Sequence, residues 1–303
     1  MTDAKTYGIG IIGLGIMGSR MAEALKQHPR FRVVGAYDPA PPAGSDLSRV
    51  TAPAELAEHP AVDCLYVASP PAHHAAGVDL AIQFHKPILC EKPLASTVEE
   101  AESMRDRIAA ARVPAAVNFY LAAAESATRM RQLVSNSALG EIKQARLTLR
   151  FNAWPRPWQS GAGAWLSSSA EGGYTREVGS HFLFQAGRIF GPGRCAETHA
   201  QRGPDGTETV LRARIDYRGV ALEIDGAIVD GPDEYNRFEI TGTKGQAALV
   251  DWDELDYGGS LDDLPAVPDA LDQLAAMLDG KPHQLARFDE GAAVVRLTEA
   301  LLA

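Results

Sequence analysis

Hydrophobic and polar positions follow different patterns in the two halves of the chain. Up to about residue 121, short apolar runs alternate with stretches in which apolar residues recur at helical spacing. The apolar runs are YGIGII, RVVGAY, DCLYVAS, PILC and AAVNFY. Buried strands separated by amphipathic helices are typical of a parallel sheet with crossover helices. We therefore expect residues 1–121 to form an α/β domain.

One helix of this half has visible boundaries. In residues 96–112, Ser96 or Thr97 is a candidate cap for a helix. The apolar residues that follow have a period near 3.6: Val98, Ala101, Met104 and Ile108.

From about residue 141 the apolar positions alternate with polar ones at a period of two. The clearest case is EIKQARLTLRF at 141–151, which predicts a strand with one exposed face. The runs 209–217 and 220–229 repeat this pattern, while RFEITG and QAALVD flank the turn TKG. Such closely spaced strands are antiparallel neighbours.

Two helices, at 268–280 and 288–303, are expected to end the chain, the first with Gly280 as its C-cap. Segments rich in proline and glycine at 39–44, 191–206 and 258–268 indicate loops. We expect residues 122–303 to form an α+β domain with a mainly antiparallel open sheet, used for substrate binding and oligomerisation.

Composition narrows the class of protein. A chain of 303 residues is long enough for two domains with proper cores. The net charge of −10 opposes a phosphate backbone, so we expect no nucleic-acid partner. Cys64, Cys90 and Cys195 are too widely spaced for a zinc site or a disulfide framework, which favours the reducing cytoplasm and no metal. No apolar run approaches the roughly 18 residues that span a bilayer, and no export signal is expected.

The segment GLGIMG carries the first chemical motif. It places Gly13, Gly15 and Gly18 in G-x-G-x-x-G register directly after an apolar strand and at the start of a helix. In a dinucleotide site these glycines permit the tight turn, the approach of a pyrophosphate and close helix packing. Ile16 and Met17 lie inside the motif, so we predict that they border the cofactor.

Asp38 follows the second apolar strand, where an acidic side chain would accept hydrogen bonds from the adenosine ribose hydroxyls. A 2′-phosphate beside this carboxylate would be repelled, and the following PAPPAG contains no arginine. NAD is therefore the expected cofactor. NADP stays open as the alternative, because a later loop could supply a cation.

Two further stretches, SPPAHHAAGVDLAIQFHKPILCEKPLA and NFY, extend this pattern. Together with GLGIMG they resemble the glucose–fructose oxidoreductase, inositol dehydrogenase and rhizopine catabolism (Gfo/Idh/MocA) family of NAD(P)-dependent oxidoreductases. The resemblance implies an N-terminal Rossmann domain with a doubly wound parallel sheet. It also implies a set of cofactor-lining residues, with Asn118 at the nicotinamide end and Lys92 as the active-site lysine: Ser69, Pro70, His74, Glu91, Lys92 and Asn118.

The resemblance extends to EGGYTREVGSH at 171–181, which matches the family's second active-site segment without a gap. It places His181 at the family's acid/base position, and an imidazole titrates near working pH. Glu177 stands where the family has aspartate, and it would orient His181 or pair with Arg176. A second family aspartate is replaced by Phe184. These departures predict a pocket that suits polyols less well.

Candidate substrate contacts are Trp165, Tyr174 and Arg176. Trp165 belongs to NAWPRPWQSGAGAW, whose aromatic rings could stack on a sugar or could simply cover an interface. We expect hydride transfer between nicotinamide and a secondary alcohol or ketone of a sugar, polyol or related cyclic compound. Two alternatives remain: glycoside cleavage or elimination through transient oxidation, and a non-catalytic dinucleotide-sensing regulator. The resemblance also implies a homodimer or homotetramer.

Overall fold

The computed structural model describes residues 5–42, 44, 46–159, 164–261 and 264–303. It divides into two compact units, one formed by residues 1–118 and 271–292 and the other by residues 119–270 and 293–303. None of the described helices has both the length and the apolar character needed to cross a bilayer.

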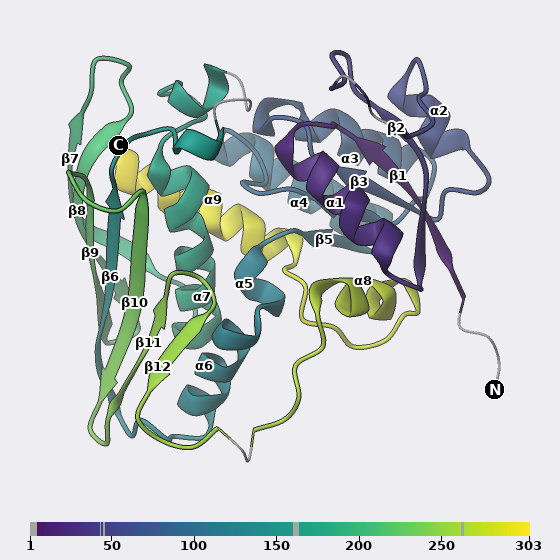
Figure 1. The fold of residues 1–303 in the computed structure, drawn as a ribbon. Coiled ribbons are helices and arrows are strands. Elements are labelled where there is room, and N and C mark those ends of the chain that lie inside the picture. Colours follow the sequence, from purple (N-terminus) through teal and green to yellow (C-terminus); the bar gives the residue numbers. More distant parts are fainter. Residues whose placement is uncertain (1–4, 43, 45, 160–163, 262–263) are drawn as a thin grey trace. The chain divides into compact units, whose positions relative to one another are not determined.

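The first unit is built on a five-stranded parallel sheet, as the alternating pattern predicts (Figure 1). Its strands lie in the order β2-β1-β3-β4-β5, so the chain reverses direction across the sheet beside β1, where doubly wound sheets bind ligands. The strands are β1 (Tyr7–Ile12), β2 (Phe31–Tyr37), β3 (Cys64–Val67), β4 (Ile88–Cys90) and β5 (Ala115–Val117). The connecting helices are α1 (Ile16–Gln27), α2 (Pro53–Glu58), α3 (His74–Gln83) and α4 (Val98–Ala111).

Helix α4 confirms the expected cap. The hydroxyl of Thr97 accepts a hydrogen bond from the Glu100 backbone N–H at 3.2 Å, which satisfies one of the unpaired amides at the helix start. The buried face consists of Ala101, Met104 and Ile108. The fifth strand is shorter than predicted: it ends at Val117, and Tyr120–Ala123 forms a short helix, α5.

Residues 271–292 belong to the first unit, which differs from the expected boundary at residue 121. Helix α8 (Ala270–Leu278) contributes Leu274, Ala275 and Met277 to the core that contains β1. Polar contacts fix its end, because Tyr7 donates a hydrogen bond to Asp279 at 2.6 Å and Arg30 donates one at 2.8 Å. A contact between the first strand and a residue so late in the chain has no local signal in the sequence.

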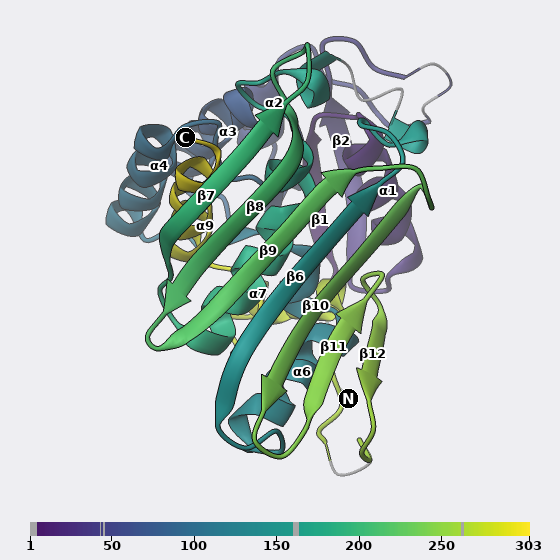
Figure 2. The same ribbon diagram turned by 90° about the vertical axis from the view of Figure 1, so that its left-hand side faces the viewer.

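The second unit contains a seven-stranded sheet in the order β12-β11-β10-β6-β9-β8-β7 (Figure 2). Only β6 and β9 run parallel. In chain order, the first four strands of this sheet are β6 (Ile142–Phe151), β7 (Arg194–Arg202), β8 (Glu208–Tyr217) and β9 (Val220–Ile228). The last three are β10 (Glu234–Gly242), β11 (Gln246–Val250) and β12 (Glu254–Tyr257). Helices α6 (Glu125–Ser135), α7 (Ser180–Phe190) and the end of α9 (Phe288–Leu302) lie against one face (Figure 1).

The mainly antiparallel sheet is confirmed, and so are the two hairpins expected from the spacing of the strands. The expected loop at 191–206 is wrong, because most of it forms β7. This edge strand has no large apolar side chain and therefore lacks the period-two pattern, so only its backbone pairing with β8 identifies it.

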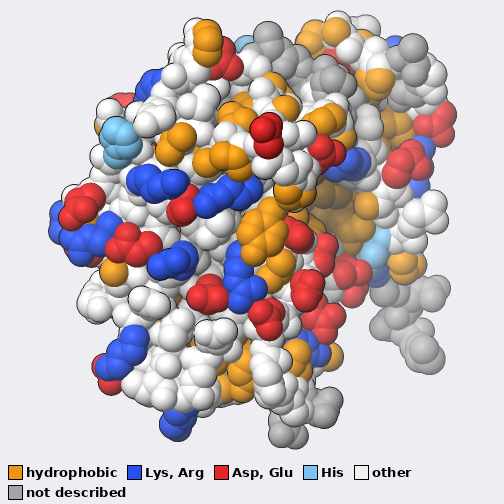
Figure 3. All heavy atoms as spheres, turned by 60° about the vertical axis from the view of Figure 1, so that its left-hand side comes forward, with side chains coloured by type: hydrophobic (Ala, Val, Ile, Leu, Met, Phe, Trp, Pro, Cys, Tyr) orange, Lys and Arg blue, Asp and Glu red, His pale blue; other side chains and the backbone are white. Residues whose placement is uncertain are grey.

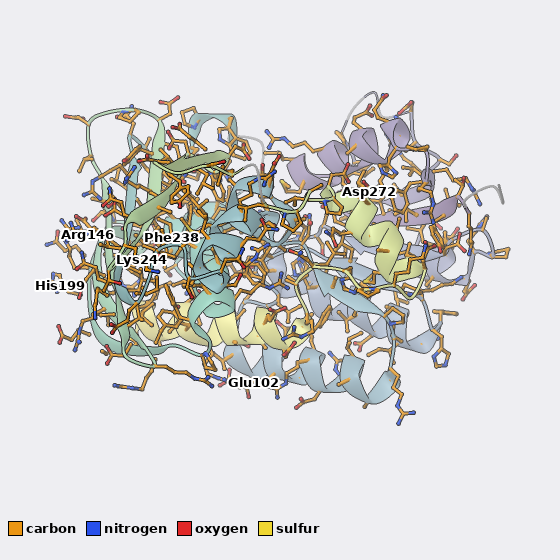
Figure 4. All side chains as sticks on the ribbon, turned by 90° about the horizontal axis from the view of Figure 1, so that it is seen from below. Glu102, Arg146, His199, Phe238, Lys244 and Asp272 are labelled. Carbon is orange, nitrogen blue, oxygen red and sulfur yellow. The ribbon has the colours of Figure 1, made fainter. Side chains whose placement is uncertain are left out.

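The two faces of the sheet differ as the alternation predicts. Phe238 is fully buried and pairs with Leu147, whereas the neighbouring Arg146 is exposed and pairs with Glu239; Figure 4 shows Arg146 and Phe238 at this sheet. Basic and acidic side chains alternate over the outer face (Figure 3). Several form ion pairs, including Arg150 with Asp225 at 2.8 Å and Arg237 with Glu239 at 2.8 Å.

The contacts of Asp279 predict a pH-dependent stability. Hydrogen bonds from Lys281, Tyr7 and Arg30 hold the pKa of Asp279 well below its usual range, so its stabilising effect is complete above the pKa of an unfolded aspartate, about 3.9. As the pH falls below that value, the unfolded chain takes up a proton first and the stabilisation decreases. Urea unfolding should show Asp279→Asn less stable than wild type at pH 7, with a smaller difference at pH 3. An equal difference at both pH values would contradict this role.

Candidate active site

The glycine turn after β1 contains two glycines that the fold itself requires. Gly13 has φ +100°, and a Cβ there would lie 2.5 Å from the carbonyl carbon of Ala68. A Cβ on Gly18 would lie 1.9 Å from the carbonyl oxygen of Gly13. A side chain at either position would push the turn, the helix or the loop after β3 apart.

Gly15 is different, because nothing in the described chain requires a glycine there. Its φ of −62° suits any residue, and no described atom lies within 4 Å of a Cβ built on it. The position is exposed and forms the N-cap of α1, where backbone amides and the helix dipole favour an anion. Close approach of a pyrophosphate explains this glycine, so the turn fits a dinucleotide.

Asp38 has backbone partners on both carboxylate oxygens. Oδ2 accepts a hydrogen bond from the Leu14 N–H at 2.6 Å, and Oδ1 accepts one from the Ala40 N–H at 2.8 Å. The carboxylate therefore ties the end of β2 to the glycine turn. Each oxygen has a further lone pair, so ribose binding stays a prediction. Ile16 and Met17 begin α1, and Met17 is one of the few large apolar side chains that are exposed.

A buried carboxylate connects the ends of three neighbouring strands. Glu91, directly after β4, accepts hydrogen bonds from the Tyr66 hydroxyl at 2.5 Å and from Asn118 Nδ2 at 2.6 Å. It also accepts one from the Lys92 backbone N–H at 3.2 Å. Burial raises the pKa of Glu91, although the donors from Tyr66 and Asn118 and the charge of Lys92 oppose the rise. The carboxylate thus holds Asn118 and the backbone of Lys92 in place.

His74, an expected cofactor contact, binds the backbone of two loops, and its contact with the cofactor stays a prediction. Its side chain is fully buried, with Nε2 2.9 Å from the Ser69 carbonyl oxygen and Nδ1 3.1 Å from that of Leu94. Burial lowers the pKa of His74. The imidazole therefore joins the loop after β3, which carries Ser69 and Pro70, to the loop that follows Lys92. The Ser69 hydroxyl itself is buried and has no hydrogen-bond partner among the described residues.

In the second unit, the glycine pair at 172–173 lets the motif segment pack closely. A Cβ on Gly172 would lie 2.1 Å from the Leu166 carbonyl oxygen, and Gly173 has φ +95° with the Glu208 carboxylate against it. Glu208 accepts a hydrogen bond from the Thr175 N–H at 2.6 Å, and burial raises the pKa of Glu208. Residues Thr175–Gly179 then form a π-helical turn that leads into α7. Such turns are frequent at functional sites.

Aromatic rings surround His181, the second residue of α7. The imidazole lies perpendicular to the ring of Phe119, with centroids 5.6 Å apart, and perpendicular to Trp252 at 5.1 Å. Phe184 stacks on Phe119 at 4.7 Å. His181 is 6 % exposed, so these rings shield most of the imidazole from water.

Glu177 has an arginine partner that the sequence did not suggest. Its carboxylate lies 3.6 Å from Arg156 and accepts a hydrogen bond from Gln159 at 3.3 Å. Arg156 is buried, binds Glu234 at 2.8 Å and lies over the Trp158 ring at 4.6 Å. A buried arginine between two carboxylates compensates both charges. The only local signal was an arginine between two prolines and two tryptophans in WPRPW.

Two of the expected substrate contacts are bound within the protein, and their contact with a substrate stays a prediction. The donors of Arg176 bind Glu299 at 2.7 and 2.9 Å and nearby backbone carbonyls, which ties the π-helical turn to α9. Tyr174 is fully buried against Phe151 and Trp154. Trp165 is partly exposed and stays a candidate. More exposed aromatic rings belong to Trp158, at 45 %, and Tyr120, at 48 %.

The structure thus assembles the predicted residues in two groups. The glycine turn, Asp38 and the cluster around Glu91 lie at the carboxyl ends of the strands in the first unit. Glu177 and His181 lie in the second unit with Arg156 and Trp252. Lys92 and His181 belong to different units, and their action on one substrate stays a prediction.

Two family models match this chain. Residues 7–119 match the model described as "Oxidoreductase family, NAD-binding Rossmann fold". Residues 127–248 match the "GFO/IDH/MocA C-terminal domain". Together the two matches include the glycine turn, Lys92 and the motif segment.

Relatives with named activities are distant. The chain is 28 % identical to glucose-6-phosphate 3-dehydrogenase of Bacillus subtilis over 60 % of its length, a match that spans only about half, 53 %, of that relative. It is 26 % identical to human trans-1,2-dihydrobenzene-1,2-diol dehydrogenase over 80 % of its length and 73 % of the relative's.

Solved structures show the same fold. GenD2 from gentamicin A biosynthesis, in complex with NAD, matches 98 % of this chain and 93 % of its own, with a TM-score of 0.80 and 21 % identity. The WlbA dehydrogenase of Bordetella pertussis, in complex with NADH and UDP-GlcNAcA, matches 98 % of this chain and 97 % of its own, with a TM-score of 0.83 and 18 % identity. The chain therefore belongs to the Gfo/Idh/MocA oxidoreductase family, with an NAD-binding Rossmann fold in its first unit and the family's C-terminal domain in its second.

Proposed function

We propose that the protein is an NAD-preferring dehydrogenase or reductase that transfers a hydride between the nicotinamide and a secondary alcohol, or its ketone, in a ring compound. The observation that carries the proposal is the open, exposed space over Gly15 at the start of α1, a cradle that the fold leaves unfilled and that suits a pyrophosphate. The family match and the complexes of NAD and NADH with proteins of the same fold support it.

In this mechanism, bound NAD supplies the hydride acceptor. His181 takes the proton of the substrate hydroxyl as general base. Lys92, as ammonium, donates a hydrogen bond to the same oxygen and stabilises the negative charge that develops there. The shielding of His181 by Phe119 and Trp252 keeps water from competing for that proton. Glu177, fixed by Arg156 and Gln159, helps to orient the motif segment.

A ring compound is proposed because the second unit exposes aromatic surface. Trp158 and Tyr120 are among the few large apolar side chains that are exposed, and Trp165 is partly exposed. Flat apolar rings stack well on the apolar faces of sugars and other cyclic alcohols. Glucose 6-phosphate and a dihydrobenzene diol, which the relatives' names specify, are both of this kind.

The cradle can be tested by comparing Gly15→Ala with Gly18→Ala. A methyl group at position 15 enters only the space assigned to the pyrophosphate, so NADH affinity should fall about tenfold or more, equivalent to at least 1.4 kcal/mol, with an unchanged unfolding temperature. Gly18→Ala should instead destabilise the fold by about 1–3 kcal/mol through overpacking. Fluorescence titration with NADH and thermal unfolding separate the two effects. If Gly15→Ala binds NADH as tightly as wild type, the space over Gly15 does not hold the pyrophosphate, and the proposal loses its main support.

The cofactor preference depends on the charge of Asp38. Wild type should bind NADH more tightly than NADPH, because the carboxylate repels a 2′-phosphate. Asp38→Asn keeps the size and an oxygen for the Leu14 N–H, so the ratio of NADPH to NADH affinity should rise about tenfold, an electrostatic change of about 1.4 kcal/mol. Tighter binding of NADPH by the wild type in the same titration would contradict the preference.

The chemical step is tested with NAD and three probe alcohols: glucose 6-phosphate, myo-inositol and trans-cyclohexane-1,2-diol. NADH formation at the nicotinamide band measures kcat. Lys92→Ala and His181→Ala should each lower kcat about a hundredfold or more, the usual contribution of such groups, and Glu177→Gln should cost less. If both alanine variants stay within about threefold of wild type, the proton-transfer assignment is wrong. Bound cofactor without NADH release would favour transient oxidation instead.

A further inference from the structure

Trp252 adopts a backbone conformation that a tryptophan rarely takes. Trp252 lies in the turn between β11 and β12 and has a φ of +76°. Asp251, which precedes it, has a φ of +44°. Outside glycine, a left-handed backbone is strained, and such residues cluster at functional sites.

A second hairpin of the same unit provides a comparison. The turn between β8 and β9 also has two consecutive positive φ values, +46° at Arg218 and +99° at Gly219. There the second position is a glycine, which adopts this conformation without strain. The β11–β12 turn is one residue longer, yet it carries the largest side chain at its second positive position.

Three hydrogen bonds with two elements hold Trp252 in this conformation. Its backbone N–H donates to Asn236 Oδ1 at 3.3 Å, and its carbonyl accepts a hydrogen bond from the Ser126 hydroxyl at 2.9 Å. The indole Nε1–H donates to Glu234 at 2.9 Å. All its polar groups are therefore bonded, to β10 and to α6, so the position of the ring is fixed.

The fixed ring lies against the predicted base. The indole is perpendicular to the His181 imidazole, with an interplanar angle of 89° and centroids 5.1 Å apart, and it also packs on Phe182 at 5.4 Å. A ring that only filled the core could be carried by a strand residue, whose backbone has no strain. The strain has an explanation if a ring can contact His181 only from this turn.

We propose that Trp252 is a positioning residue for His181: the strained β11–β12 turn holds the indole so that it fixes the plane of the imidazole for proton transfer. The proposal rests on the proposed function, since His181 is its proton acceptor. Trp252 has no contact with the reacting atoms in this role. It acts on the rate through the orientation of another side chain.

Three variants separate this role from simple packing. Trp252→Asn relaxes the turn, because asparagine tolerates positive φ, and removes the ring. Trp252→Phe keeps an aromatic ring and loses only the bond to Glu234, which retains Arg156. Arg218→Asn relaxes the other hairpin and is the matched control. None of them alters Glu177, Glu234 or Arg156, so the charges near His181 stay constant.

For whichever probe alcohol the wild type oxidises fastest, Trp252→Asn should lower kcat about tenfold, as expected from a misplaced catalytic group, with KM within about threefold. Trp252→Phe should recover most of the rate, and Arg218→Asn should match wild type. In the His181→Ala background, Trp252→Asn should cause no further loss, because residues that act as a unit are not additive. An equal loss in both backgrounds would show a merely structural role and overturn the proposal.

Two outcomes of the same rate measurements separate this proposal from the proposed function. If His181→Ala is inactive and Trp252→Asn oxidises the probe alcohol at the wild-type rate, the positioning role is overturned and the proposed function stands. If His181→Ala retains full activity, the proposed function itself fails.

Discussion

The buried carboxylate of Glu91 is the interaction on which the cofactor side of the structure depends. A carboxylate removed from water is costly unless hydrogen-bond donors replace the lost hydration. Here the donors come from three neighbouring strand ends: Tyr66 of β3, Asn118 just after β5 and the backbone of Lys92 itself. Satisfying one charge therefore fixes the positions of the strand ends and of the loop that carries the proposed catalytic lysine. His74 also supports this loop, through its contacts with the carbonyls of Ser69 and Leu94.

The second unit also contains buried charged groups, and these compensate one another through a series of ion pairs. Buried Arg156 lies between Glu177 and Glu234, so each carboxylate gains a cation and the guanidinium is compensated. Glu234 also accepts the indole N–H of Trp252, whose ring contacts His181. The π-helical turn, β10 and the β11–β12 hairpin are thus connected through side chains that all lead toward the same imidazole.

Local patterns explain why much of this was predictable and some of it was not. The glycine register, the Thr97 cap and the period-two strands are signals within a few residues, and the structure agrees with them. Arg156 and Glu234 are 78 residues apart, and Tyr7 and Asp279 are 272 apart, so no local period could pair them. Arg176, a candidate substrate contact, binds Glu299, which is 123 residues away in the chain and which no local pattern pairs with it. Edge strand β7 was missed because backbone pairing alone defines it.

The two departures from the family pattern are Glu177 and Phe184. Both side chains contact other residues in this structure, and both alter the surroundings of His181. Glutamate at 177 has one more methylene group than the family's aspartate, and its carboxylate reaches Arg156 and Gln159. Phe184, where the family often has another aspartate, stacks on Phe119, which in turn contacts the His181 ring. One acidic group is thereby committed to a buried ion pair and another is replaced by an aromatic ring. The surroundings of the proposed base consequently contain fewer carboxylate acceptors and more aromatic side chains, which supports the proposal of a cyclic substrate.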